Sequence, residues 1–547
     1  MGKFVIAIGG TGMRCLESFV HLCAIGMFDN EEINILTLDT DQTNGNKGRV
    51  EQLINLYQKV KSERPDTIDG GSPNANTFFS AKLNLYRYFT DYNSPTRKTY
   101  QNLSQMSSGT SEQKEDNREL SELMLDEGVR NFALDHGYRA QTHLGSMLMY
   151  NGIIEAARSV AADKSKAKSQ DKELAAFATK LAQDASNAMV FVFGSVFGGT
   201  GASSIPVVPV ALSEAVRIVS GGSQSLDLRV VKFGATLLTK YFTFKTPDKS
   251  QKEKEKVIAD ANNFALNSQA ALQFYQADPT VKSCYKRLYH IGWPINSIDL
   301  SEDNPKTITG GAEQKNDCHV VELLSACAAY DFFTLSKFDN QQAQYLYRSA
   351  DFTGSNFSFE GSDFVGNEKG SILENKLGAF LSFAHIVLSV NRAALSNAKG
   401  TMGFLERFKK QDIMDYDQGI TEAQAGDIDE YMKWFAYDYS NDKLTRGWIY
   451  QIYKSIKPGR FIFKPSAFTE NAKELRRLDP GDIFEDDKHN WDKGGFMSSG
   501  SYDKYVKTLI DQRCRPKKEQ NANTTKERFL AHIYNSITIV QNFNELT

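Results

Sequence analysis

The chain has 547 residues, of which 41% are hydrophobic, enough for two or three domains around a large buried core. It contains 64 Lys and Arg against 67 Asp and Glu, and the net charge of -3 is too small to draw the protein onto nucleic acid. The six cysteines are scattered and include no C-x-x-C pair, which argues against a zinc site or a redox couple and for free thiols in a reducing compartment.

No apolar run reaches the length that spans a bilayer, so we expect no transmembrane segment. The N-terminal sequence, MGKFVIAIGGTGMRC, is interrupted by glycines too early for a signal peptide, and Ile6 breaks the myristoylation pattern. We therefore expect a cytoplasmic protein.

The first predicted unit is a strand, a glycine turn and a helix. Residues 3–8 form a short apolar run, Gly9-Gly10-Thr11-Gly12 follows, and apolar residues then recur at helical spacing over 13–25. A second strand, 33–38, ends in Asp39-Thr40-Asp41-Gln42, and open α/β sheets bind ligands at the carboxyl ends of their strands. The polar stretch 104–117 predicts an exposed loop or helix end.

The same pattern returns later in the chain. Residues 189–193 are almost wholly apolar, as expected inside a parallel sheet, and lead into GSVFGGTGASS and a predicted helix at 207–219. Further strands are predicted at 228–238 and 285–291, with a long helix at 252–275 between them. This alternation predicts an α/β protein with a doubly wound, mostly parallel sheet.

A polar loop leads into an apolar helix at 320–333, and beyond it the patterns weaken into aromatic-rich segments such as QYLYRSADF and a terminal helix at 527–540. We predict a nucleotide-binding domain over residues 1–333 and a second domain, α+β or helical, over residues 334–547.

Two glycine clusters, each after an apolar strand and each opening a helix, predict a divided phosphate cradle. Glycine at such a turn exposes backbone N–H groups and removes the β-carbon that would block a phosphate. The first cluster alone also fits a tight turn without a ligand, or a dinucleotide fold, although Cys15 stands where the third glycine of G-x-G-x-x-G belongs. In the second, Thr200 offers a hydroxyl to a phosphate, whereas Ser203 or Ser204 as a helix cap is the structural alternative.

The segment MVFVFGSVFGGTGASSIPVVPVAL resembles the strand, signature loop and helix of the tubulin/FtsZ superfamily, whose motif is (G/A)GGTG(S/T)G. IAIGGTGMRCLESF is similar to the family's first phosphate loop, INILTLDTDQTN to the segment ending in an N-T-D triplet, and GYRAQTHLGSMLMYNGIIEAA to the loop over the terminal phosphate. These matches cover about residues 3–330 and are closer to divergent bacterial tubulin-like proteins than to tubulin itself. Phe197 replaces the first signature glycine and Ser203 the last.

The resemblance implies a site for GTP or GDP with Mg2+. The residues it places around the phosphates are Gly9, Gly10, Thr11, Gly12 and Met13 on one side and Gly198, Gly199, Thr200, Gly201 and Ala202 on the other, with Arg14 adding charge. Asp39 and Asp41 would lie near the nucleotide through Mg2+ and its waters, or else form a strand-end turn and helix cap. Asn263, in preference to Asn262, would face the guanine edge, and a solvated polar face is the alternative.

In this family, hydrolysis is completed by acidic residues on a loop of the next subunit, which implies a GTPase that assembles head to tail into filaments. The corresponding loop precedes the helix 320–333 and includes Glu313 and His319, the latter where an acid is expected. Asp317 and Glu322 are the predicted water-orienting residues, and Asn316 matches the family's loop asparagine. Alternatively, Asp317 caps the helix and Glu322 is a first-turn acid facing its dipole.

Two other functions stay open at this point. One is a nucleotide-binding scaffold that assembles, or recruits an unidentified protein partner, without turnover. The other is a dinucleotide-dependent enzyme, disfavoured because Asp39 lies far beyond the usual distance of about 20 residues from the first loop and the second glycine cluster has no place in such a site. The resemblance also implies a bacterial setting, such as a defence or stress system. The tubulin-like hypothesis requires the segments beginning at Gly9 and Gly198 to converge on one polyphosphate.

Overall fold

The computed structural model describes residues 2–62, 69–106, 110–242, 257, 260–293, 316–338, 344–346, 360–366, 368–388, 422–440, 443–456, 463–478, 483–484 and 512–540.

The described part of the chain is built on a seven-stranded, all-parallel sheet with the strand order β3-β2-β1-β4-β5-β6-β7. Its strands are β1 (Lys3–Ile8), β2 (Glu32–Asp39), β3 (Lys82–Phe89), β4 (Met189–Phe193), β5 (Lys232–Leu238), β6 (Tyr285–Ile291) and β7 (Gln344–Leu346). In register, Lys3 lies opposite Ile33 on one side and Met189 on the other, so β1 is a central strand. A separate antiparallel hairpin joins β8 (Tyr437–Ser440) and β9 (Lys443–Arg446).

The helices fall into three groups along the chain. The first group is α1 (Gly9–Ala24), α2 (Gly45–Lys61), α3 (Tyr100–Met106), α4 (Ser111–Met124), α5 (Glu127–Asn131), α6 (Thr142–Ala162) and α7 (Ser169–Asp184). The second is α8 (Thr200–Ser204), α9 (Val208–Val219), α11 (Phe264–Ala277), α12 (Pro279–Cys284) and α14 (Val320–Thr334). The third is α15 (Gly361–Val365), α16 (Gly370–Leu388), α19 (Glu422–Phe435), α20 (Trp448–Ile456), α21 (Ala472–Arg477) and α23 (Thr525–Val540). None of the described helices combines the length and the apolarity needed to cross a bilayer.

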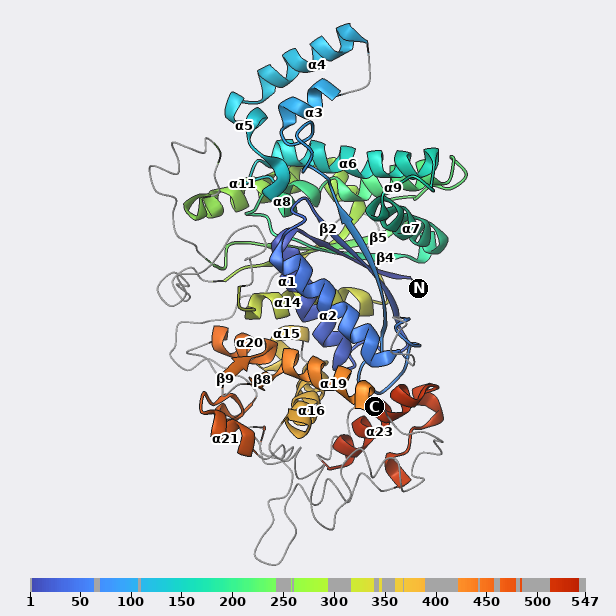
Figure 1. The fold of residues 1–547 in the computed structure, drawn as a ribbon, viewed down its shortest axis with the longest axis vertical. Helices are drawn as coiled ribbons and strands as arrows, with labels where there is room; N and C mark the ends of the chain where they lie inside the picture. Colours follow the sequence, from blue (N-terminus) through green and yellow to red (C-terminus); the bar gives the residue numbers. More distant parts are fainter. Residues whose placement is uncertain are drawn as a thin grey trace, which may run out of the picture.

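Both faces of the sheet are buried, which explains why β4 is apolar at every position and β1 at every position after Lys3. On β1, Phe4, Ile6 and Ile8 join a core formed with α6, α7 and α9, whereas Val5 and Ala7 join a second core formed with α1, α2 and α14. Figure 1 shows these two sets of helices on opposite sides of the strands. The fold is therefore an α/β sheet covered by helices on both faces, as the alternation of elements predicted.

A further helical layer, the C-terminal layer, consists of α16, α19, α20 and α23 and covers the outer side of α1, α2 and α14 (Figure 1). Tyr431 packs against Tyr57 and Phe79, with ring centroids 6.4 and 4.8 Å apart. Phe435 packs against Trp448 and against the ring of His21 on α1. Residues on both sides of the predicted boundary at residue 333 thus belong to one continuous hydrophobic core.

Several predicted elements are confirmed at both ends, and among those whose bounds differ three bear on the site or its surroundings. The strands β4 and β6 have the predicted bounds: β4 is wholly apolar, and β6, YKRLYHI, carries aromatic and aliphatic side chains at Tyr285, Leu288, Tyr289 and Ile291. The first helix begins at Gly9 instead of Met13, so the glycines form its first turn. Most of the stretch 104–117 is helix, because Thr110 and Gln113 form a capping box at the start of α4.

The third difference concerns the predicted helix 252–275. Residues 251–256 and 258–259 lie outside the described residues, and the described helix α11 starts at Phe264. Among its residues only Phe264, Ser268 and Tyr275 are buried. It is therefore an outer helix on the sheet, whereas α14, with twelve buried residues, occupies the centre of the molecule.

Candidate functional site

The two glycine clusters follow the two central strands, β1 and β4, which are neighbours in the sheet. The helix after β1, α1, covers one face of the sheet, and the helices after β4, α8 and α9, cover the other. Adjacent strands whose connections leave in opposite directions form a switch point, where open α/β sheets bind their ligands. The sequence thus places both glycine clusters at the expected binding edge.

The two clusters are in direct contact. Gly9 has φ +66°, and a β-carbon built on it would lie 3.3 Å from Cβ of Thr200 and 3.8 Å from the backbone nitrogen of Gly201. A β-carbon on Gly199 would lie 2.7 Å from the nitrogen of Ala140 and 3.0 Å from that of Arg139. The predicted convergence of the segments at Gly9 and Gly198 is confirmed, and the loop before α6 joins them.

The loop before α6 is held in an unusual backbone conformation. Gly137, Arg139 and Ala140 have φ of +84°, +45° and +67°. Residues other than glycine adopt this left-handed backbone region only where their surroundings impose it. A β-carbon on Gly137 would lie 3.4 Å from the hydroxyl of Thr200 and 3.9 Å from that of Thr40. The Thr40 hydroxyl is buried and has no hydrogen-bond partner among the described residues, so a polar group is available beside the glycine loops.

Three helices begin at this edge without a side-chain cap. The residues before α1, α6 and α8 are Ile8, Gln141 and Gly199, and none of their side chains accepts a hydrogen bond from the first turn. By contrast, Asn44 caps α2, which begins after the neighbouring strand β2. Open N–H groups and the positive end of the helix dipole favour an anion. The arrangement around Gly10, Thr11 and Gly198, which stay partly exposed, can therefore receive a polyphosphate.

Four further residues of the two clusters pack against other parts of the protein, namely Gly12, Met13, Gly201 and Ala202. A β-carbon on Gly12 would lie 2.6 Å from the carbonyl oxygen of Phe193, and one on Gly201 would lie 2.7 Å from that of Ser195. The side chains of Met13 and Ala202 are buried. The two glycines let α1 approach β4 and let α8 approach the segment that follows β4, which positions the more exposed part of each loop.

Phe197, at the start of the second glycine loop, is buried in an aromatic cluster beside the site. Its ring centroid lies 4.7 Å from that of Phe264, 5.6 Å from Phe242 and 6.3 Å from Tyr241. These contacts hold the start of the loop against the first residue of α11.

Asp39 and Asp41 hold the turn between β2 and α2. Asp39 Oδ1 accepts from the backbone nitrogens of Thr40 (2.7 Å) and Asp41 (3.3 Å), and Oδ2 accepts from Asn44 Nδ2 (2.9 Å). Asp41 Oδ1 accepts from Thr43. The alternative of a strand-end turn is thus confirmed, although the cap of α2 is Asn44.

These carboxylates fit a directly bound Mg2+ poorly. Burial, with a smaller contribution from the nearby carboxylate of Asp41, raises the pKa of Asp39 to about 6, and both its oxygens are engaged in the turn. No group of three or more metal-binding side chains occurs among the described residues. Mg2+ readily takes phosphate oxygens and waters as ligands, and the hydroxyls of Thr40 and Thr200 are the protein groups that would face such an ion.

Arg14, predicted to add charge to the nucleotide, is bound within the protein. Its Nε donates to Glu322 Oε1 at 2.5 Å and its Nη2 donates to the carbonyl of Asp317 at 2.5 Å. Glu322 is fully buried and also accepts from the hydroxyl of Tyr241 (2.7 Å) and the backbone nitrogen of His319 (3.0 Å). Burial raises the pKa of the Glu322 carboxyl, and Arg14 opposes that rise.

This geometry corrects the predicted catalytic role of Glu322. A fully buried carboxylate whose two oxygens bind groups of its own chain cannot orient water in a neighbouring subunit. Asp317 is exposed, but its backbone is held against α1 of the same chain through Arg14. Asn316 precedes it at the start of the described segment, and Glu313 lies outside the described residues.

The helix cap at this segment is also not the predicted one. His319, not Asp317, caps α14, because its Nδ1 accepts from the nitrogen of Val321 at 3.2 Å. Glu322 completes a capping box as a first-turn acid, as the structural alternative proposed. Burial lowers the pKa of His319 to about 3, and the nearby Arg14 adds to this effect.

Asn263 does not lie on a long helix as predicted. It ends a 3-10 turn, Ala261–Asn263, and is exposed, as is Asn262. The residue that reaches the glycine loop is Asn267, whose Nδ2 donates to the carbonyl of Phe197 at 3.3 Å. A polar residue one turn beyond Asn263 was the only signal in the sequence for this contact.

Comparison with protein-family models, with curated proteins and with solved structures finds no match to this chain.

Proposed function

We propose that this chain binds a guanine nucleotide, GTP or GDP, with its phosphates at the first turns of α1 and α8 and at the 137–140 loop. The observation that carries the proposal is the direct contact of the two glycine loops, through Gly9 and Thr200, at the switch point of a parallel sheet. The uncapped helix starts and the unpartnered Thr40 hydroxyl support an anion there. The choice of guanine rests on the resemblance to the tubulin/FtsZ superfamily.

Gly198→Ala tests the proposal with little risk to the fold. A β-carbon at this position would have only the Ser195 hydroxyl nearby, at 3.3 Å, so the variant is expected to fold. The methyl group would block close approach of a phosphate, and affinity for GDP measured by calorimetric titration should fall about ten-fold or more, which corresponds to about 1.4 kcal/mol.

Gly426→Ala is the matched control, because no atom lies within 4 Å of the added methyl group. It should bind GDP as the native chain does. Equal affinity of the native chain and Gly198→Ala, or the retention of NAD or a flavin by the purified protein, would contradict the proposal.

Because Glu322 is buried, its position favours a nucleotide-binding scaffold over a GTPase whose hydrolysis is completed by a neighbouring subunit. A surface for self-association lies beside the glycine loop, on α11, where Leu266 and Phe274 are 65% and 53% exposed. Because Tyr275 of the same helix donates to the carbonyl of Ala202, this surface is tied to the second loop. We propose nucleotide-dependent association of the chain without significant hydrolysis.

Sedimentation velocity and phosphate release together test the scaffold proposal. Nucleotide should increase the sedimentation coefficient, Leu266→Ser should reduce that increase, and phosphate release per subunit should stay negligible at every protein concentration. A rate that rises with protein concentration would instead support the head-to-tail GTPase.

A further inference from the structure

A polar stripe runs along α1 on the side that faces the C-terminal layer. Its members lie at positions i, i+3, i+4 and i+7, which share one face of a helix, and are Arg14, Glu17, Ser18 and His21. Each is buried and each bonds to a group more than 300 residues later in the chain. The helix that begins with the glycine turn is therefore fixed along its length.

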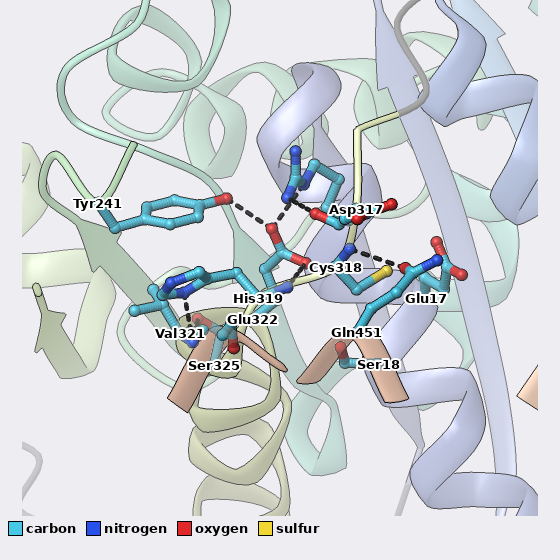
Figure 2. A network of polar contacts seen from close by, with 12 residues as sticks. Glu17, Ser18, Tyr241, Asp317, Cys318, His319, Val321, Glu322, Ser325 and Gln451 are labelled. Carbon is cyan, nitrogen blue, oxygen red and sulfur yellow. Dashed lines mark hydrogen bonds and ion pairs between the residues drawn. The ribbon is translucent and has the colours of Figure 1, made fainter. Parts of the chain in front are cut away.

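The bonds of the stripe reach three different helices. Trp434 on α19 donates to Glu17 at 3.1 Å, Trp448 on α20 donates to Ser18 at 3.0 Å, and the hydroxyl of Tyr431 lies 3.1 Å from Nδ1 of His21. Arg14 makes the first link, to the segment that starts α14. Figure 2 shows Glu17 and Ser18 of α1 beside Gln451 of α20 and the segment from Asp317 to Glu322.

Arg14 is the member of the stripe nearest to the glycine turn. It lies four residues after Gly10 and three after Thr11, so the three share a helix face. The segment that holds Arg14 is itself fixed, because Cys318 N donates to Gln451 at 2.9 Å and Val320 N donates to Ser455 at 2.9 Å. A chain of bonds thus connects the C-terminal layer to Arg14, in the second turn of α1, directly after the glycine turn.

We propose that Arg14 is a positioning residue for the anion site: held by Glu322 and the Asp317 carbonyl, it fixes the glycine turn of α1 in its binding conformation without contacting the phosphates. This inference rests on the proposed function, since it concerns the same site. Its physical basis is that breaking a buried, hydrogen-bonded ion pair is costly, so the pair restrains rotation and translation of the helix start. The C-terminal layer is then part of the scaffold of the binding site.

Glu322→Gln separates the possible roles of Arg14 by the sign of its effect. If Arg14 positions the turn, loosening it should weaken GDP and GTP binding by the same factor, on the order of ten-fold or more. If Arg14 instead contacted phosphate, removing the opposing carboxylate would leave its charge free and strengthen binding, more for GTP than for GDP. Calorimetric titration of both nucleotides with Mg2+ distinguishes these results, and increased or unchanged affinity overturns the proposal.

Glu17→Gln is the matched control, because Glu17 is a second buried carboxylate on the same stripe, paired with Arg49 at 2.8 Å. It should lower the melting temperature comparably and change nucleotide affinity less than about two-fold, since it lies one turn further from the glycines. An equal loss of affinity in Glu17→Gln would show a general effect of lower stability and would overturn the proposal.

Tyr241→Phe keeps the test decisive if Glu322→Gln does not fold. It removes only the hydroxyl that donates to Glu322 and should weaken both nucleotides in the same direction by a smaller factor. If Tyr241→Phe binds both nucleotides as the native chain does, the proposal is wrong. If the native chain binds neither nucleotide, the proposed function fails and this inference falls with it, whereas normal binding that is insensitive to these changes overturns the inference alone.

Discussion

His319 shows how burial decides the chemistry of a single residue. Its ring accepts a hydrogen bond from the backbone of α14 through Nδ1, which requires that nitrogen to be unprotonated. The ring is buried, and Nε2 has no partner among the described residues. A group with this lowered pKa stabilises the fold fully above its unfolded value of 6.5, and that stability is lost as the pH falls from 6.5 toward about 3.

Replacing this residue with asparagine should flatten the acid dependence of stability. His319→Asn keeps a side chain that caps helices well but cannot be protonated. Between pH 7 and pH 5 the native chain should lose about 2 kcal/mol of unfolding free energy through this histidine, and the variant should not. Urea unfolding at the two pH values measures the difference, and equal losses in both proteins would contradict the assignment.

Asp39 and His385 also change the unfolding free energy over this pH range, in the native chain and in the His319→Asn variant alike. Burial lowers the pKa of His385 to about 4, so it adds a loss of the same sign as His319. Asp39 acts in the opposite direction, because its raised pKa makes its stabilising contribution largest below 3.8 and removes it as the pH rises through about 6. Between pH 7 and pH 5 this contribution of Asp39 raises the unfolding free energy by about 1 kcal/mol, which is less than the loss caused by the two histidines.

At the scale of elements, α1 combines a glycine turn that is exposed only at Gly10 and Thr11, and there in part, with a tightly packed body. Gly12 faces the backbone of β4, where a β-carbon would lie 2.6 Å from the carbonyl oxygen of Phe193 and 3.2 Å from the carbonyl carbon of Ala7. Backbone atoms of a central strand cannot move aside as a flexible side chain can. Glycine is therefore needed at this position for a steric reason: a larger residue would keep the helix from approaching the sheet so closely.

Gly12→Ala should destabilise the protein by about 1 to 3 kcal/mol, because the added methyl group overpacks the contact between α1 and β4. Gly48→Ala is its control on α2, an exposed helical position with no atom within 4 Å, and should raise stability by about 1 kcal/mol. Denaturant unfolding measures both changes. Tolerance of alanine at position 12 would mean that α1 moves more freely on β4 than the close contact indicates.

The elements that could be predicted from the sequence are those specified by local pattern. β4 follows from a short apolar run, and the meeting of the loops at Gly9 and Gly198 follows from the shared carboxyl edge of parallel strands. The polar stripe of α1 can be recognised in the sequence by the helical spacing of its four residues. The partners of Arg14 and Ser18 lie 308 and 430 residues away, and no local pattern specifies them. The role of Glu322 was wrong for this reason, since a first-turn acid looks the same whether it faces solvent or a buried arginine.

At the scale of the whole molecule, the sheet and the C-terminal layer share one hydrophobic core. Phe78 of the N-terminal part packs between Phe380 and Phe383 of α16 and against Tyr534 of α23. Lys526 of α23 donates to the backbone of Lys59 at 2.6 Å. Separate domains are usually joined by smaller and more polar interfaces than this.

Because the core is continuous, the full chain should unfold in one calorimetric transition. The predicted second domain, residues 334–547, should show no earlier transition of its own, since unfolding it would expose the apolar faces of α1, α2 and α14. Differential scanning calorimetry tests this, with intrinsic fluorescence of Trp434 and Trp448 reporting the interface. Two resolved peaks would show that the layer unfolds independently.

The partners of α1 also determine when it can be completed during protein synthesis. The ribosome makes Ser18 long before Trp448, and the bond between them cannot form until the 430 residues that separate the two have been translated. Because buried polar groups without partners disfavour stable native packing, α1 cannot reach its native environment before α19 and α20 have been synthesised. The segment proposed to bind nucleotide is thus translated well before the helices that complete its surroundings.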